Sequence, residues 1–346
     1  MATLSIIIPV YNGGSDLKRC LTALRESSFG DWELIVVDDG STDGSDELAG
    51  RSGARVIASS GRVGPAAARN IGAEMARGEY LLFLDADCVV QPDTLGLVVE
   101  SLRTDPGLEA LFGSYDDSPG AANFMAQYKN LFHHYVHQHG REEASTFWTG
   151  CGAMKRTRFL ALGGFDIQRY RRPSIEDIDL GYRLKRAGGR IRLAKNIQVK
   201  HLKAWSFLAV LKSDIFDRGI PWTRLILRDR IFTGDLNLQT HNRVSVVATY
   251  GLLLSLAISL FQPQGLIVTL GLVLLLLILN LDLYRFFYDK RGLAFSLRVI
   301  PLHWLYYFYN AISFGLGLLL HWQEQLWARV ISSPGSFADG VDTDGH

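Results

Sequence analysis

Short apolar runs alternate with segments of helical spacing over the first two hundred residues. The runs LSIIIPVYN (4–12), ELIVVDD (33–39), ARVIAS (54–59) and YLLFLDADC (80–88) carry the large apolar residues of buried strands. Residues 14–27 and 64–78 have helical spacing, and Pro65 stands in the first turn of the second segment. Strands that alternate with helices in this way predict parallel βαβ units in a doubly wound α/β sheet.

The pattern changes in the last third of the chain. No charged residue occurs from Val244 to Leu281, which predicts membrane crossings. We expect three, at about 244–261, 266–284 and 300–320. Arg243 and the basic loop 285–298 flank these spans, and the positive-inside rule therefore predicts a multi-pass protein of the cytoplasmic (inner) membrane whose N-terminal domain is cytosolic.

A segment of aromatic and basic residues joins the two parts. Residues 202–240 are expected to form amphipathic helices in the membrane interface, with basic side chains toward lipid headgroups. The alternative is a solvated amphipathic helix that packs on the domain.

The chain is thus predicted to have four regions. They are 1–201 (an α/β domain), 202–240 (amphipathic interfacial helices), 241–322 (about three transmembrane helices) and 323–346, a polar, glycine-rich tail expected to be disordered.

Composition narrows the class of protein. The 346 residues carry a net charge of only +1, so no global field indicates nucleic acid as a partner. The three cysteines, Cys20, Cys88 and Cys151, form no Cys-x-x-Cys pair, which is typical of a reducing compartment. The first residues, MATLSIIIPVYN, lack a basic leader and are expected to form a strand rather than a signal peptide.

Carboxylates follow two of the predicted strands. Asp38 and Asp39 end one strand, and Asp85 and Asp87 end another. Ligands of such sheets bind beyond the carboxyl ends of the strands, where these acids are expected to meet. If residues 85–87 are extended, Asp85 and Asp87 point to one side and form a site for Mg²⁺ or Mn²⁺. A solvated acidic turn is the alternative.

Five motifs, in this order, resemble the family 2 glycosyltransferases of the GT-A fold. They are SIIIPVYNGGSDLKRCLTAL, ELIVVDDGSTDGS, AAARNIGAEMARGEYLLFLDADC, TGCGAMKRTRFLALGGFD and EDIDLGYRLKRAGGRI, and they span about residues 4–201. Each motif alone is a weak signal, whereas the ordered set is specific. The resemblance implies a Rossmann-like, mostly parallel GT-A domain that binds a nucleotide-diphosphate sugar, with UDP favoured and GDP and dTDP left open.

The resemblance also implies roles for single residues on the donor side. Pro9, Tyr11 and Asn12 would line the nucleotide pocket. Asp39 would recognise the base of the nucleotide, and Arg69 would contact the nucleotide. Asp85 would approach the ribose and the metal, and Asp87 would ligate Mg²⁺ or Mn²⁺. For Asp38 a turn-capping role and a binding role stay open. TGCGAMKR (149–156) would lie beneath the donor sugar, with Cys151 as packing.

The motif PSIEDIDLGYRLKRAG predicts a helix and supplies the candidate base. Ser174 and Asp177 have capping-box spacing, and an N-terminal helix position favours an ionised carboxylate. A hydroxyl nucleophile needs such a base. The resemblance implies that Asp177 is the base of an inverting transfer and that Glu176 orients the acceptor, while Asp179 is expected to be structural.

Histidines supply further candidates. His201 ends the strand after the base-bearing helix, and the resemblance implies a metal ligand there, although the residue alone leaves a packing role open. The cluster His133, His134, His137 and His139 includes an i,i+4 pair, but no acidic pattern accompanies it, so zinc is not favoured. In the family this region varies with the acceptor.

RGIPW (218–222) resembles a motif of polymerising membrane-bound relatives, with Arg218 and Trp222 matched and Pro221 in place of an arginine. This implies an acceptor opening without repeated chain extension. The expected function is transfer of a sugar to a hydroxyl of a lipid or lipid-linked acceptor at the cytoplasmic membrane face. A polyprenyl-phosphate sugar synthase, a synthase that also secretes its polysaccharide, and a catalytically silent nucleotide-sugar-binding membrane protein are the alternatives.

Overall fold

The computed structural model describes residues 2–230 and 240–332, with side chains as far as residue 327. Its first elements are β1 (Leu4–Val10), α1 (Gly14–Arg25), β2 (Trp32–Asp38), α2 (Ser45–Arg51), β3 (Arg55–Ala58), α3 (Pro65–Met75) and β4 (Tyr80–Leu84). The predicted alternation of strands and helices is confirmed. Pro65 opens α3, where its missing N–H leaves no helical hydrogen bond unmade.

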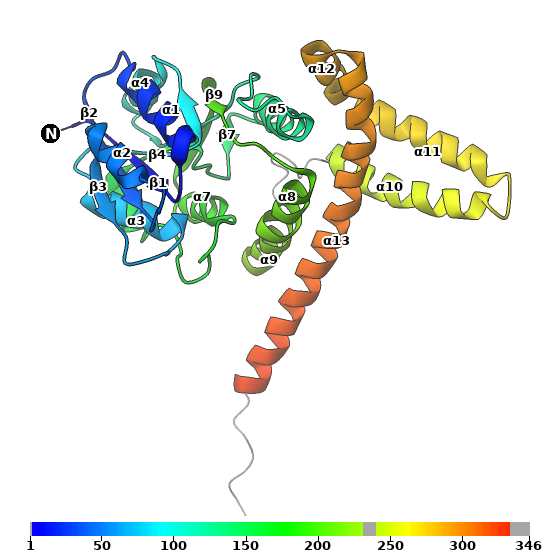
Figure 1. The fold of residues 1–346 in the computed structure, drawn as a ribbon. Coiled ribbons are helices and arrows are strands. Elements are labelled where there is room, and N and C mark those ends of the chain that lie inside the picture. Colours follow the sequence, from blue (N-terminus) through cyan, green and yellow to red (C-terminus); the bar gives the residue numbers. More distant parts are fainter. Residues whose placement is uncertain (1, 231–239, 333–346) are drawn as a thin grey trace, which may run out of the picture.

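One sheet organises the α/β domain (Figure 1). The remaining elements are β5 (Cys88–Val90), α4 (Thr94–Thr104), β6 (Leu108–Tyr115), α5 (Phe124–His139), β7 (Glu143–Ala144), β8 (Cys151–Lys155), α6 (Arg156–Ala161), α7 (Glu176–Arg186) and β9 (Arg190–His201). The strand order is β3-β2-β1-β4-β8-β6-β9-β5, with β7 paired to β9.

The sheet is mixed rather than mostly parallel. β1 runs parallel to β2 and β4, and β2 runs parallel to β3, as predicted. β8, however, is antiparallel to both β4 and β6, and β5 and β7 are antiparallel to β9. The apolar pattern of a buried strand carries no information on its direction, so the sequence could not reveal the change.

Both faces of the sheet are covered. Ile6 and Ile8 of β1 pack into a cluster with Leu17, Leu21 and Val98 from α1 and α4. Ile7, which points the other way, packs into a second cluster with residues of α3, α6 and α7. The two buried faces leave the carboxyl edge of the sheet as the place where polar side chains gather.

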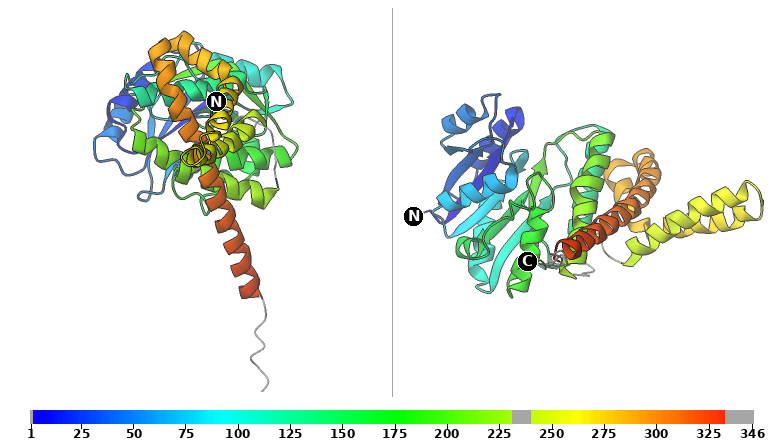
Figure 2. Two further views of the ribbon diagram at one scale, coloured as in Figure 1. Left: turned by 90° about the vertical axis from the view of Figure 1, so that its right-hand side faces the viewer. Right: turned by 90° about the horizontal axis from the view of Figure 1, so that it is seen from below.

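Helices make up the rest of the described chain. They are α8 (Phe207–Lys212), the π-helix η1 (Ser213–Gly219), α9 (Ile220–Asp229), α10 (Thr240–Ser259), α11 (Gly265–Leu279), α12 (Leu281–Arg291) and α13 (Leu293–Ser332). α10 and α11 form a hairpin that projects away from the α/β domain, and α8 and α9 lie between that domain and α13 (Figures 1 and 2). α13 approaches η1 and α9 closely, since a Cβ on Gly219 would lie 2.6 Å from Ser313 and one on Gly317 2.6 Å from Thr223.

Fewer of the described helices qualify as membrane spans than the three that the sequence predicted. Among the described helices, α10 is long and apolar enough to cross a membrane, and α11 and α12, bent by 64°, qualify only together, as a broken span or a re-entrant loop. The third predicted span lies inside α13, which does not qualify; it carries polar residues such as His303 and Asn310. Residues 231–239 and 333–346 of the predicted interfacial segment and tail lie outside the described residues, while residues 323–332 continue α13.

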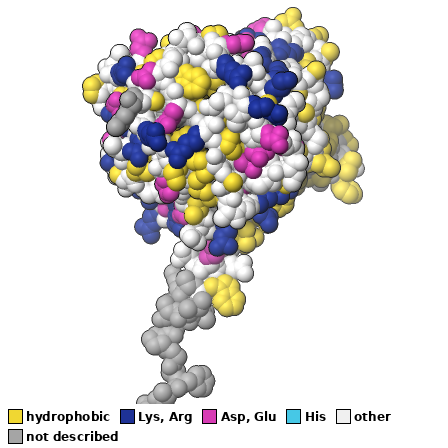
Figure 3. Space-filling model, turned by 60° about the vertical axis from the view of Figure 1, so that its left-hand side comes forward, with side chains coloured by type: hydrophobic (Ala, Val, Ile, Leu, Met, Phe, Trp, Pro, Cys, Tyr) yellow, Lys and Arg dark blue, Asp and Glu magenta, His cyan; other side chains and the backbone are white. Residues whose placement is uncertain are grey.

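The face of the molecule drawn in Figure 3 carries acidic and basic side chains interspersed among polar and apolar ones. No large patch of one sign is visible on it.

Candidate active site

A cavity of about 920 Å³ lies between the carboxyl edge of the sheet and the C-terminal helices. It brings together eight predicted site residues, which are Arg69, Asp85, Asp87, Glu176, Asp177, His201, Arg218 and Trp222. The other four, Pro9, Tyr11, Asn12 and Asp39, lie at or near the ends of β1 and β2 and do not line it.

Asp85 and Asp87 both reach the cavity, but not as an extended pincer. Residues 85–87 form a turn, in which the N–H of Cys88 donates to the carbonyl of Asp85 over 3.0 Å. The two carboxylates then take different partners. Oδ1 of Asp85 lies 2.7 Å from Nη2 of Arg69, and Oδ2 of Asp87 lies 3.4 Å from Nε2 of His201.

The orientation of His201 suits a metal ligand. The amide nitrogen of Asn130 donates to the carbonyl of Asp116, which leaves Asn130 Oδ1 to accept from Nδ1–H of His201 at 3.1 Å. In the neutral ring, Nε2 then presents a lone pair toward the carboxylate of Asp87. Two electron-pair donors that face each other need a cation or a proton between them, and a fixed second ring nitrogen is typical of metal-bound histidine.

Asp87 and His201 therefore fit a divalent ion. With no metal ion between them, a proton on Nε2 takes its place: burial raises the pKa of Asp87, but the hydrogen bond and charge of the protonated His201 outweigh it and hold this pKa below its usual value. Among the described residues, no group of three or more His, Cys, Asp or Glu side chains is arranged around one point. Further ligands would come from a bound diphosphate, as is common for Mg²⁺.

Arg69 joins the two acidic segments of the site. Its guanidinium, held by α3, is buried and donates from Nη1 to Glu176 at 3.0 Å as well as from Nη2 to Asp85. A buried cation between two carboxylates compensates charges that would otherwise be costly. Arg69 thus links the turn after β4 to the start of α7.

Asp177 lies beside the loop that precedes β8. Its Oδ2 accepts from the N–H of Thr149 at 3.2 Å and from the hydroxyl of Thr149 at 3.4 Å. Burial is the main cause that raises the pKa of Asp177 to about 6, and the charge of Glu176 adds to it. A carboxylate with a pKa near the working pH is a suitable general base.

The predicted capping box is wrong. α7 begins at Glu176 with Ile175 as its N-cap, and no side chain caps it. The hydroxyl of Ser174 instead donates to the carbonyl of Asp217 in η1, and the N–H of Ser174 donates to Oε2 of Glu176. Glu176, predicted to orient the acceptor, is thus buried with both carboxylate oxygens engaged inside the protein.

Asp39 organises the loop that leads into α3. Its carboxylate accepts from the N–H of Val63 at 2.7 Å, the N–H of Gly64 at 2.9 Å and the hydroxyl of Ser59 at 3.0 Å. Nearby, the guanidinium carbon of Arg62 lies 3.9 Å from the centre of the Tyr11 ring. Asp38 accepts from the N–H of Ser41, the turn-capping contact that the sequence left open.

The opposite wall of the cavity comes from the C-terminal helices. Arg218 of η1 and Trp222 of α9 line it, and the indole N–H of Trp222 donates to the hydroxyl of Tyr182 at 3.1 Å. Sequence reasoning missed the other contributors, among them Lys129, Asp214, Trp148, Tyr306 and Phe314. A π-helix and a wall made by a distant helix leave no local signal in the sequence. The histidine cluster on α5 was the one available signal, since His133 and His137 line this cavity.

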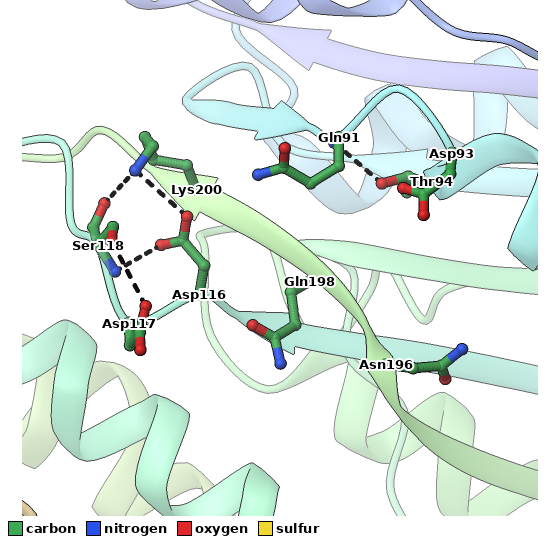
Figure 4. A pocket seen from close by; sticks show the side chains of 9 residues that line it. All are labelled: Gln91, Asp93, Thr94, Asp116, Asp117, Ser118, Asn196, Gln198 and Lys200. Carbon is green, nitrogen blue, oxygen red and sulfur yellow. Dashed lines mark hydrogen bonds and ion pairs between the residues drawn. The ribbon is translucent and has the colours of Figure 1, made fainter.

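A second pocket, of about 450 Å³, opens beside β9 (Figure 4). Its polar residues include Asp116, whose carboxylate lies 3.3 Å from the ammonium group of Lys200. None of the predicted site residues lines it. The site chemistry is therefore concentrated in the larger cavity.

Residues 5–163 match the model of "Glycosyl transferase family 2". Residues 5–163 belong to glycosyl transferase family 2. The matched residues contain β1 to β8, the turn at residues 85–87 and Thr149, whereas Asp177 and His201 follow them.

Two relatives are similar to part of the chain. Glycosyltransferase GlyG of Streptococcus pneumoniae is 30% identical over 125 residues, which cover 34% of this chain and 41% of GlyG. The pre-mycofactocin glycosyltransferase of Mycobacterium tuberculosis is 29% identical over 57% of this chain and 42% of that protein. The chain thus spans less than half the length of these relatives.

The structure of mannosyltransferase PcManGT from Pyrobaculum calidifontis, solved with GDP-Man and Mn²⁺, resembles this one with a TM-score of 0.60 and 18% identity. The match covers 90% of this chain and 86% of that one. It shows that the chain has the fold of this neighbour through most of its length.

Proposed function

We propose that the protein is a metal-dependent, inverting glycosyltransferase. It moves a sugar from a nucleotide-diphosphate sugar to a hydroxyl of a lipid or lipid-linked acceptor at the cytoplasmic face of the membrane. The observation that carries this proposal is that Asp177 lines the same cavity as the Asp87–His201 pair. Separate cavities for the base and the metal candidates would have excluded the reaction.

The donor end of the cavity has the groups for a nucleotide diphosphate. Asp87 and His201, with Asp85 beside them, would hold Mg²⁺ or Mn²⁺, and the ion would neutralise charge on the departing diphosphate. Pro9, Tyr11, Asn12 and Asp39, at the same edge of the sheet, would hold the nucleoside. GDP-Man and Mn²⁺ in the structural neighbour support this class of donor and cofactor. UDP, the commonest nucleotide of such donors, is the first candidate, with GDP and dTDP as alternatives.

Asp177 performs the proton transfer. Thr149 holds one of its oxygens, and its raised pKa of about 6 leaves it mostly ionised at neutral pH but basic enough to accept a proton. As the acceptor oxygen bonds to the anomeric carbon, its proton passes to Asp177, and the bond to the diphosphate breaks on the opposite face. This in-line displacement inverts the anomeric centre.

The acceptor end supports an amphipathic substrate. Trp222, Ile226, Val246 and Phe314 line this part of the cavity, and Arg218 adds a positive charge. These residues belong to α9, α10, α13 and η1, and α10 is apolar enough to cross a membrane. A lipid-borne acceptor could therefore enter from the membrane side.

Asp177→Asn tests the proposal. Membranes that contain the full-length protein are incubated with Mn²⁺ and a panel of UDP-, GDP- and dTDP-sugars, and extracted lipids are analysed by mass. The parent is expected to add one hexose-type mass to a lipid, and Asp177→Asn to lose at least ~100-fold in rate. Undiminished transfer by Asp177→Asn would favour an acceptor phosphate that needs no base, and no release of nucleoside diphosphate from any donor would favour a silent binding protein.

A further inference from the structure

Five aromatic rings form a continuous group along one wall of the cavity. His133 and His137 of α5 have ring centres 4.0 Å apart, and Trp148, in the loop before β8, lies 5.1 Å from His133 and 5.5 Å from His137. Tyr115, at the end of β6, lies 4.8 Å from Trp148 and stacks on His201 at 4.2 Å. Each of these residues lines the cavity.

Trp148 is held in place by its own loop. A Cβ on Gly150 would lie 2.2 Å from Cζ2 of Trp148, so only glycine allows the indole to lie against this backbone. The next residue, Thr149, is the one that holds Asp177. Trp148 is only half-buried, which leaves part of its ring to the cavity.

His133 differs from its neighbours on α5. His134 and His137 place Nδ1 within 2.7 Å and 3.2 Å of backbone carbonyls of Tyr115 and Gly113, whereas Nδ1 of His133 is buried and has no hydrogen-bond partner among the described residues. A buried nitrogen without a partner is costly, and a ligand hydroxyl would remove this cost. Burial also lowers the pKa of His133 well below its usual value, so the ring is neutral and offers one donor and one acceptor.

Two members of the group fix its position in the cavity. Tyr115 stacks on His201 beside Asp87, where the diphosphate would sit, and Trp148 directly precedes Thr149, which holds the base Asp177. A sugar ring joined to the diphosphate and presented to the base would lie alongside the wall between Tyr115 and Trp148.

We propose that Trp148 and His133 form the subsite for the transferred sugar, in which the indole packs on the apolar face of a pyranose and the imidazole binds a ring hydroxyl. This inference rests on the proposed transfer from a nucleotide-diphosphate sugar. A pyranose has an apolar C–H face and a polar rim, and a flat half-buried ring beside a neutral hydrogen-bonding ring matches both. His133 is therefore the residue that distinguishes epimers, because an inverted hydroxyl loses its partner.

The test uses the full-length protein in detergent or nanodiscs with Mn²⁺. His133→Phe keeps an aromatic ring and removes both nitrogens, Trp148→Leu removes the flat surface, and His139→Phe is the matched control on the exposed side of α5. UDP and GDP binding is measured by calorimetry. The kcat/KM for nucleoside diphosphate release is measured with the glucose, galactose and N-acetylglucosamine conjugates of UDP and with GDP-mannose.

His133→Phe is expected to lower kcat/KM for the preferred sugar about tenfold, the worth of one hydrogen bond, and to reduce the preference over the epimer by a similar factor. Binding of free UDP or GDP stays unchanged, and His139→Phe behaves as the parent. Trp148→Leu raises KM for every sugar without changing the order of preference. His133→Asn, which retains a donor and an acceptor, recovers part of the loss and replaces His133→Phe if that variant does not fold.

Three results overturn the inference while leaving the proposed function intact. They are an unchanged preference among sugars in His133→Phe, an equal loss of free nucleotide binding, or full activity in Trp148→Leu. If the parent releases no nucleoside diphosphate from any conjugate, the proposed function fails and the sugar subsite fails with it.

Discussion

Nη2 of Arg69 lies 2.7 Å from Oδ1 of Asp85, and the same guanidinium reaches Glu176, the neighbour of the candidate base, on its other side. Arg69 comes from α3, Asp85 from the turn after β4 and Glu176 from the start of α7. A single buried side chain thus fixes the spacing between the donor end and the acceptor end of the cavity.

Arg69→Met should destabilise the protein by about 3 kcal/mol, since it leaves the buried carboxylate of Glu176 and the partly buried one of Asp85 without their cation. Thermal and chemical unfolding in detergent measures this loss. The exposed ion pair of Arg51 with Glu47 supplies the control, because Arg51→Met should change stability by less than about 1 kcal/mol. Equal effects of the two substitutions would contradict the assignment of Arg69 as a linking residue.

The activity should fall in acid with a midpoint near pH 6. Burial and Glu176 raise the pKa of Asp177 to about 6, and the reaction needs the deprotonated form, so kcat/KM rises as the pH rises through 6.

The raised pKa of Asp177 also affects stability. The folded protein binds this proton more tightly than the unfolded chain does, so this contribution to stability is present at low pH and disappears as the pH rises through 6.

Glu176→Gln should move the acidic limb to lower pH, since it removes the negative charge that helps to raise the pKa of Asp177. The measurement is a pH–rate profile of nucleoside diphosphate release for both proteins. A limb that stays in place, or that moves toward neutral pH, would count against Asp177 as the titrating group.

Metal binding should depend on a side chain that does not touch the metal. Asn130 accepts from Nδ1–H of His201 and fixes the ring, so Asn130→Ala should weaken Mn²⁺ binding about tenfold and His201→Ala by more. Titration of Mn²⁺ by electron paramagnetic resonance with saturating UDP or GDP measures both. Asp117→Asn, in the second pocket, should leave the affinity unchanged; wild-type affinity in His201→Ala would exclude His201 as a ligand.

The α10–α11 hairpin should determine membrane association. Val247, Leu254, Ile267 and Leu270 are exposed on it, and such a surface is unfavourable in water. Replacing all four by serine should move the protein from the membrane pellet toward the supernatant after carbonate washing and centrifugation. Serine at the exposed Leu160 and Ile167 of the α/β domain is the control, and a variant that remains fully in the pellet would show that other helices bind the membrane.

The sequence predicted the first half of the sheet closely and the second half less well. β1 to β4 and their helices were recognisable because buried strands and helices with one apolar face have local patterns, with Pro65 as the clearest marker. The direction of β8 depends on its neighbours β4 and β6 and has no such pattern. The capping box at Ser174 was wrong because the Ser174 hydroxyl found a partner in Asp217, 43 residues further along the chain.

The same distinction applies to the site. The cluster of eight predicted residues around one cavity follows from the rule that strand ends meet at one edge, helped by the family resemblance. The engagement of Asp39 by its own loop and the wall built by Tyr306 and Phe314 depend on three-dimensional contacts. No spacing along the chain could have revealed either.

The C-terminal helices complete the cavity. Lys129 of α5 pairs with Asp214 of η1, and Asp214 also accepts from the hydroxyl of Tyr309 in α13 at 2.8 Å. On the proposed function, a chimaera that grafts the C-terminal third of a relative onto this α/β domain is expected to take the relative's choice of acceptor. Shortening the chain to obtain a water-soluble form would remove one wall of the reaction chamber.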